Sequence, residues 1–140
     1  MRELTIPDWL TPASTPELTH NVIDLWWIDL TVQTCHPDWL DQRERQRMAE
    51  FKDEVLQDRY CASRCALRAI LAGYLGLRPE AVPLQISEHG KPELADQHRL
   101  PFNLSHCGDW ALIGCTRANS TEKNSMGTNA IGVDVEAIRT

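Results

Sequence analysis

Two acidic side chains near the end of the sequence have a spacing that suits a divalent cation. In the run Ile131–Glu136, alternation along a β-strand places Asp134 and Glu136 on one face and the branched apolar residues on the other. Two carboxylates one pleat apart can hold a hard, oxygen-seeking ion such as Mg²⁺. An exposed strand face without a metal explains the same pattern, so both interpretations stay open.

A second candidate group ends the run Phe102–His106, where Ser105 and His106 emerge at the end of an expected strand. Adjacent strand residues point to opposite faces, which disfavours a Ser–His hydrolase pair because a nucleophile must hydrogen-bond its base. His106 is better suited to contact a phosphate or a metal-bound group. A histidine satisfied by neighbouring backbone is the other interpretation.

Cations are the third candidate group. In His89–Pro92 a glycine permits close backbone approach and a proline stiffens the turn, which leaves Lys91 as a positioned cation. Basic residues also gather in the two early helical stretches and could bind a phosphate group or an acidic protein, or form a solvated helix face. These basic residues are Arg43, Arg45, Arg47, Lys52, Arg59, Arg64 and Arg68.

The first of the elements that must position these side chains is a mostly buried strand over Val22–Thr31. We expect a strand there because this run is rich in β-branched and aromatic residues. The polar run Asp38–Phe51 predicts an amphipathic helix entered through an Asp cap. A longer helix follows over Asp53–Leu75, with apolar residues at three- and four-residue steps, and Gly76 and Pro79 end it.

Strands dominate the second half of the sequence, where short apolar runs alternate with Gly, Pro and polar residues. These expected strands are Leu84–Ser87, Phe102–Ser105, Ala111–Thr116 and Ala130–Glu136. The polar stretch Arg117–Asn129 is expected to form a mobile surface loop.

The order of these elements, with helices early and strands late in the sequence, predicts an α+β fold with helices packed on a mainly antiparallel sheet. We expect an extended N-terminal arm over residues 1–21, rich in proline, and one domain over 22–140.

The composition limits the range of functions. The chain has 140 residues and a net charge of -6, which suits one domain and disfavours nucleic acid as a partner. It shows no secretory signal and no apolar run of membrane-spanning length. An odd, scattered set of cysteines predicts reduced thiols and a cytoplasmic location, with a zinc site at the second and third cysteines as the less favoured alternative. The cysteines are Cys35, Cys61, Cys65, Cys107 and Cys115.

Taken in order, the motifs resemble one family, the Sfp-type 4'-phosphopantetheinyl transferases. These enzymes move phosphopantetheine from coenzyme A to a serine of an acyl or peptidyl carrier protein. The resemblance rests on Asp58–Leu71, Gly90–Pro92, Phe102–His106 and Gly132–Glu136, which follow one another with similar gaps. It implies that residues 22–140 form the N-terminal half of a pseudo-two-fold molecule.

The resemblance also implies roles for individual residues. Asp134 and Glu136 would be Mg²⁺ ligands beside the coenzyme A diphosphate, and His106 would be the third catalytic residue. Arg59 would hold the ribose 3'-phosphate, with Arg47 as a helper. The residues that the resemblance assigns to coenzyme A are Arg47, Arg59, Gly90, Lys91, Pro92, Ser105 and His106. One turn before Arg47 the family carries a lysine, whereas this chain carries Glu44 beside Arg43.

The implied reaction is Mg²⁺-dependent phosphoryl transfer, in which a base takes the proton of the carrier serine and 3',5'-ADP leaves. In the family the second half brings a Trp-x-x-Lys-Glu motif, which this sequence does not contain. We therefore expect either a missing C-terminal half, in a longer protein or on another chain, or a homo-oligomer. The alternative function is a catalytically incomplete remnant or a module that binds coenzyme A or a carrier protein.

Overall fold

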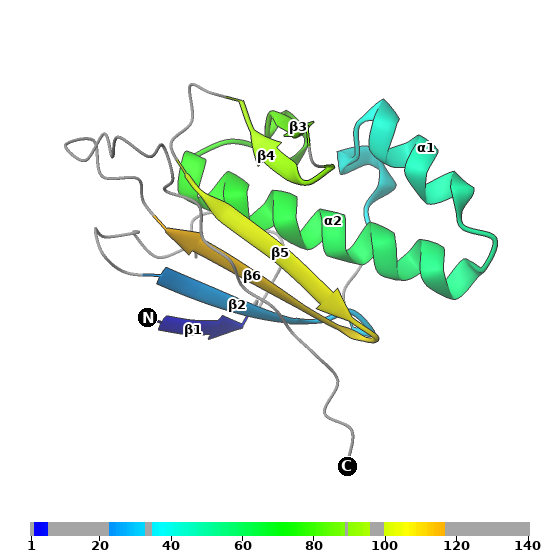
Figure 1. Cartoon of the computed structure of the whole chain (residues 1–140), viewed down its shortest axis with the longest axis horizontal. Helices are drawn as coiled ribbons and strands as arrows, with labels where there is room; N and C mark the ends of the chain where they lie inside the picture. Colours follow the sequence, from blue (N-terminus) through cyan, green and yellow to red (C-terminus); the bar gives the residue numbers. More distant parts are fainter. Residues whose placement is uncertain (1, 6–22, 33–34, 89, 96–99, 117–140) are drawn as a thin grey trace, which may run out of the picture.

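A computed structural model describes residues 2–5, 23–32, 35–88, 90–95 and 100–116 of the chain. Four strands form one sheet in the order β1-β2-β6-β5, and two shorter strands form a separate hairpin (Figure 1). The strands of the sheet are β1 (Arg2–Thr5), β2 (Ile23–Asp29), β5 (Phe102–Cys107) and β6 (Trp110–Thr116). The hairpin strands are β3 (Leu84–Ile86) and β4 (Pro92–Leu94). The helices are η2 (Pro37–Trp39), α1 (Gln42–Glu50), α2 (Glu54–Leu75) and η3 (Pro79–Ala81).

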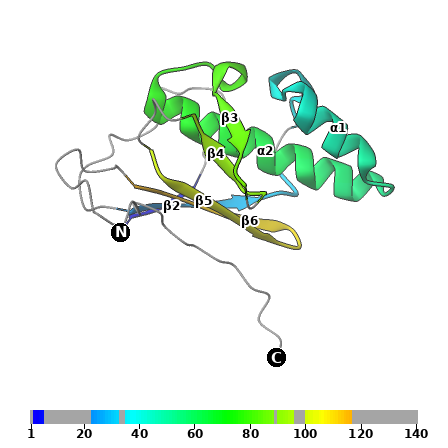
Figure 2. The same cartoon turned by 45° about the horizontal axis from the view of Figure 1, so that its top comes forward.

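The sheet is mainly antiparallel, as predicted. Strand β6 pairs antiparallel with both β2 and β5, whereas β1 pairs parallel with β2 at the edge. Helix α2 lies across one face of the sheet, and α1 and the β3–β4 hairpin lie beyond α2 (Figure 2). This order of sheet, long helix and outer layer confirms the α+β class.

Helix α2 forms where its caps and its small residues predict it. The Asp53 side chain accepts a hydrogen bond from the Val55 amide at 2.8 Å, and Gly76 ends the helix with a left-handed φ of 69°. Ala62 and Ala66, one helical turn apart, are 2% and 0% exposed and let the helix axis approach the sheet closely. The main core lies between this helix face and the inner face of β2 and β6.

Helix α1 begins three residues later than predicted. Residues 37–39 form the 3-10 helix η2, Leu40 is extended, and Asp41 caps α1. The Glu44 amide donates to the Asp41 side chain at 2.8 Å, and the Asp41 amide donates to Glu44 at 3.0 Å. This reciprocal capping box satisfies two helix-end amides, so Asp41 is a stronger start than Asp38.

Two strands were not predicted, and one predicted strand cannot be compared. Strand β4 is short and begins with a proline, and β1 lies within the expected arm 1–21, so neither has a clear strand pattern. The rest of that arm, the loop Arg117–Asn129 and the strand Ala130–Glu136 lie outside the described residues. The domain boundaries therefore stay a prediction. No helix among the described residues is both long and apolar enough to cross a bilayer.

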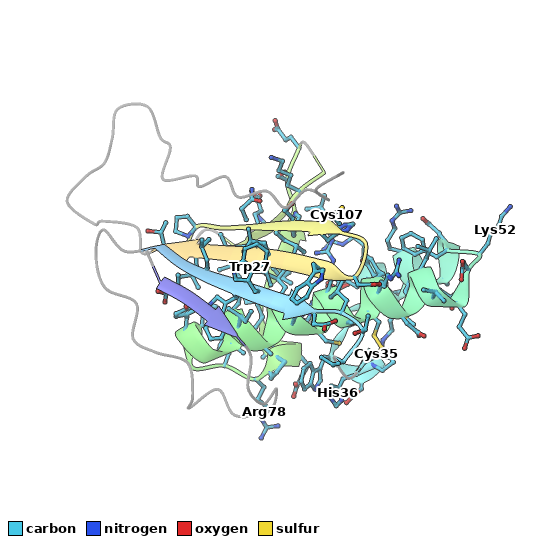
Figure 3. The ribbon with its side chains drawn as sticks, turned by 90° about the horizontal axis from the view of Figure 1, so that it is seen from below. Trp27, Cys35, His36, Lys52, Arg78 and Cys107 are labelled. Carbon is cyan, nitrogen blue, oxygen red and sulfur yellow. A yellow bond between two sulfur atoms is a disulfide. The ribbon has the colours of Figure 1, made fainter. Side chains whose placement is uncertain are left out.

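The prediction that all the cysteines are reduced thiols is wrong for one pair. Cys35 and Cys61 form a disulfide across 26 positions of sequence, drawn as a yellow bond beside Cys35 in Figure 3. Cys65, Cys107 and Cys115 are free. The partners lie on the segment before η2 and on α2, so their contact depends on tertiary packing that spacing does not encode. The cytoplasmic location stays a prediction, without support from these thiols.

A buried arginine ties the outer layer to α2. Arg68 is 1% exposed, and its guanidinium donates to Glu44 and to the backbone carbonyls of Pro79 and Val82. A longer bond of 3.4 Å reaches Asp41. One side chain of α2 therefore holds the start of α1 and the segment that contains η3.

We predict that replacing Arg68 by methionine lowers the free energy of unfolding by about 3–5 kcal/mol, because Glu44 then keeps a buried charge without its partner. Urea unfolding followed by circular dichroism measures the change. The double variant Arg68→Met, Glu44→Gln carries no lone charge and should regain part of the loss. A single variant within about 0.5 kcal/mol of the parent protein would contradict this role for the ion pair.

Candidate functional site

A pocket rich in arginine lies between α1, α2 and the β3–β4 hairpin. Its volume is about 440 Å³. Its basic lining residues are Arg43 and Arg47 from α1 and Arg64 from α2. We call this cavity the arginine pocket. Three acidic residues, Asp41, Glu44 and Glu50, line the same cavity, and Glu50 pairs with Arg47. Three guanidinium groups around one cavity can nevertheless donate several hydrogen bonds to an anion with phosphate oxygens.

Helix geometry explains how α1 presents its cations. Arg43 and Arg47 are one turn apart and exposed, so both reach the same side of the helix. The Arg47 guanidinium bonds Glu50 at 2.7 Å and lies 4.8 Å from the centroid of the Phe51 ring. Arg43 donates to the Leu84 carbonyl at 3.4 Å, which links α1 to the hairpin.

Glu44 lies between these arginines in sequence but is turned inward. It is 5% exposed and pairs with Arg68, so its charge is offset within the protein. Its second oxygen, Oε2, is buried and makes no hydrogen bond among the described residues. The glutamate that stands where the family has a lysine therefore helps to build the wall of the pocket.

Helix α2 contributes an aromatic side chain to the same wall. Tyr60 is half-buried, the Arg64 guanidinium lies 5.4 Å from its ring centroid, and Phe51 packs on it at 5.6 Å. Burial raises the pKa of the Tyr60 hydroxyl. The hydroxyl therefore stays protonated near neutral pH and can donate a hydrogen bond to an anion.

The hairpin closes the pocket with the glycine turn singled out from the sequence. Gly90 and Pro92 line the cavity, and Lys91 is exposed in the same turn. Gly90 has a φ of 79°, a conformation that other residues rarely adopt, so the turn requires glycine. The Ser87 amide donates to the Lys91 carbonyl at 2.8 Å and fixes the turn.

His106 and Arg59 lie in a second, smaller cavity of about 170 Å³. Its other lining residues are Leu30, Phe51, Leu56, Tyr60, Ser63 and Gly108. Arg59 forms an ion pair with Asp109 in the β5–β6 turn. We call this cavity the histidine pocket. Because Tyr60 lines both cavities, one side chain separates the arginine pocket from the histidine pocket.

The structure thus groups the predicted site residues in two places. Arg47, Gly90 and Pro92 share the arginine pocket, whereas Arg59 and His106 share the histidine pocket. The β5–β6 register places Ser105 opposite Leu112 and His106 opposite Ala111, so these neighbours point to opposite faces of the sheet, and Ser105 lies in the lining of neither pocket. The assigned roles of these residues stay predictions.

The predicted metal ligands cannot be placed. Asp134 and Glu136 lie outside the described residues. Within the part of the chain that the structure describes, no three His, Cys, Asp or Glu side chains are grouped so that they could hold a metal ion. The Mg²⁺ site therefore rests on the sequence pattern.

The specific roles of Tyr60 and Arg64 were missed by the sequence reasoning, which took Arg64 only as one member of a basic set. Tyr60 and Arg64 are four residues apart on α2, so they share a helix face. That spacing was a usable signal, but nothing in it distinguishes a pocket wall from a solvated surface.

Comparison with known proteins gives a consistent match. A family model described as 4'-phosphopantetheinyl transferase, N-terminal, matches residues 31–118. A phosphopantetheinyl transferase of Thraustochytrium sp. is 35% identical over 100 residues, covering 69% of this chain and 31% of that protein. The 4'-phosphopantetheinyl transferase HetI of Nostoc sp. is 31% identical over 138 residues, covering 94% of this chain and 54% of that protein. The chain thus spans from about a third to about half of the length of these relatives.

We predict that the double variant Arg47→Gln, Arg64→Gln binds inorganic pyrophosphate about tenfold more weakly, because each lost guanidinium removes a charge-assisted hydrogen bond. Isothermal titration calorimetry on the parent protein and the variant gives the two dissociation constants. Arg45→Gln is the matched control, since Arg45 lies on α1 but outside the lining and donates to the Pro37 carbonyl. Equal weakening in the control would contradict a specific pocket.

Proposed function

The chain belongs to the 4'-phosphopantetheinyl transferase family, whose N-terminal model it matches, and we propose that it binds coenzyme A and serves in transferring 4'-phosphopantetheine to a carrier-protein serine. The observation that carries this proposal is the arginine pocket. This cavity, lined by three arginines and formed by α1, α2 and the glycine turn, lies within the matched residues 31–118.

Coenzyme A has phosphate groups at its ribose and in its diphosphate, and the two cavities suit these two regions. In our proposal the arginine pocket takes the 3'-phosphate end, where Arg43, Arg47 and Arg64 offset its charge. The diphosphate passes Tyr60 toward His106 and Arg59 in the histidine pocket. This path differs from the sequence expectation in moving Arg59 from the 3'-phosphate to the diphosphate, whereas Arg47 keeps its place at the 3'-phosphate.

In the proposed reaction the hydroxyl oxygen of the carrier serine attacks the phosphorus that bears pantetheine. A new P–O bond to serine forms, the P–O bond within the diphosphate breaks, and 3',5'-ADP leaves. The serine proton passes to a base that the sequence does not identify. His106 and Arg59 would stabilise charge on the phosphate oxygens during transfer.

Magnesium is part of this proposal. Asp134 and Glu136 would hold the ion, which supplies positive charge beside the diphosphate when bound. The carrier protein would present its serine at the histidine pocket. A second half of the site would come from further protein, either a C-terminal half that continues this chain, another chain or another copy of this one. The proposed cytoplasmic location rests on the sequence alone.

We predict that Asp134→Ala lowers the rate of Mg²⁺-dependent transfer of a fluorescent coenzyme A analogue to an apo carrier protein by at least about 100-fold. The reason is that, without the metal ion, the negative charge of the diphosphate is not offset and opposes attack by the serine oxygen. Glu80→Ala, at an exposed acid on η3, is the matched control and should transfer at the parent rate.

Two results would contradict the proposal in different ways. Undiminished transfer by Asp134→Ala would remove the assigned metal role. Binding of coenzyme A by the parent chain without transfer to any carrier tested would favour the alternative, a module that binds coenzyme A without completing the reaction.

A further inference from the structure

Three sulfur atoms lie together outside the two pockets. The Cys35–Cys61 disulfide joins the segment before η2 to α2, and the Cys65 sulfur lies 3.9 Å from that of Cys61. Cys61 and Cys65 are 0% exposed, whereas Cys35 is partly exposed. The outer sulfur is therefore the one that an external reagent can approach.

This sulfur cluster is part of a small satellite core that includes α1. Leu40, Cys61 and Cys65 are buried there, and Cys35, Trp39 and Met48 pack against them. Leu40 precedes the cap of α1, and Met48 lies on α1 next to Arg47. The disulfide thus fixes to α2 the segment that leads into α1, and Met48 of α1 packs against the same cluster.

The Cys65 thiol lies beside the disulfide but does not exchange with it. Its sulfur accepts from the His36 amide at 3.3 Å and lies 3.4 Å from the His36 carbonyl. Burial raises the pKa of the Cys65 thiol to about 11. Only a thiolate attacks a disulfide, so at neutral pH Cys65 leaves the Cys35–Cys61 bond intact.

We propose that the Cys35–Cys61 pair is a redox-modification site, at which a small or protein dithiol reduces the disulfide and thereby weakens anion binding in the arginine pocket. The dithiol attacks the Cys35 sulfur, and Cys61 leaves and takes a proton. The second thiol of the reagent then displaces Cys35, which also becomes a thiol. One protein disulfide yields two protein thiols, and the dithiol becomes a disulfide.

The effect on α1 is local because a second attachment remains. Arg68 still holds Asp41 and Glu44 at the start of the helix, whereas the sulfur cluster against which Met48 packs loses its covalent bond. We therefore expect a binding change at the low end of typical couplings between sites, about fivefold. The pocket would loosen without unfolding of the domain.

The first test counts thiols in the 140-residue chain by alkylation in denaturant and mass spectrometry. With five cysteines and one disulfide, three adducts are expected without reductant and five after dithiothreitol. Cys35→Ser should give four adducts in both conditions. Five adducts without reductant, or one zinc ion per chain held by these thiols, would overturn the proposal.

The second test follows α1 by hydrogen exchange and needs no ligand. Amides of residues 42–50 should exchange faster after reduction in the parent protein and in the control Cys107→Ser, whose sulfur lies on β5. Cys35→Ser should exchange fast in both conditions. Unchanged exchange in the reduced parent protein would overturn the proposal even if the variant fails to fold.

The third test uses 3',5'-ADP, which has no thiol and so cannot itself reduce the protein. The choice of 3',5'-ADP as the ligand rests on the proposed function. Reduction should raise the dissociation constant of 3',5'-ADP about fivefold. Because coupling between two sites is reciprocal, saturating 3',5'-ADP should raise by the same factor the ratio of reduced to oxidised reagent at which half of the protein disulfide is reduced. Equal affinity in both states would overturn the coupling. Absence of 3',5'-ADP binding in either state, with altered exchange in α1, would instead overturn the proposed function and uphold the redox site.

Discussion

The buried guanidinium of Arg68 is the interaction on which the outer layer of the molecule depends. It draws together α2, the capping box of α1 and the carbonyls around η3. A guanidinium can serve this many acceptors because its donors lie in one rigid plane. Without this centre, the start of α1 and the segment around η3 would lose their polar attachment to α2.

The same ion pair also changes how much negative charge faces the pocket. Glu44 stands between Arg43 and Arg47, and on a solvated helix its carboxylate would offset much of their charge. Pairing with Arg68 turns it inward. Asp41 and Glu50 still line the cavity beside the arginines, so the pocket carries charges of both signs.

Local patterns predicted most of the fold, because caps and periodicity act over a few residues. The start of α2 at Asp53, its end at Gly76 and the strands β2, β5 and β6 all follow from such signals. Strand β1 and the Cys35–Cys61 bond did not, since each depends on partners distant in sequence. The site shows the same division: the glycine turn was predicted, whereas the partner of Arg59 depends on how the β5–β6 turn packs on α2.

The residues that we propose for anion binding and for the metal lie in different stretches of the chain. Every residue that lines the arginine pocket lies between Asp41 and Pro92, on two helices and one hairpin. The acidic pair Asp134 and Glu136 comes more than 40 positions later, on the far side of β5 and β6 in sequence. His106 on β5 comes between these two stretches in the sequence. It lines the histidine pocket, which shares Tyr60 with the arginine pocket. In our proposal, affinity for the phosphate end of a ligand can therefore persist where the chemistry is incomplete, so binding and transfer would be two separate properties.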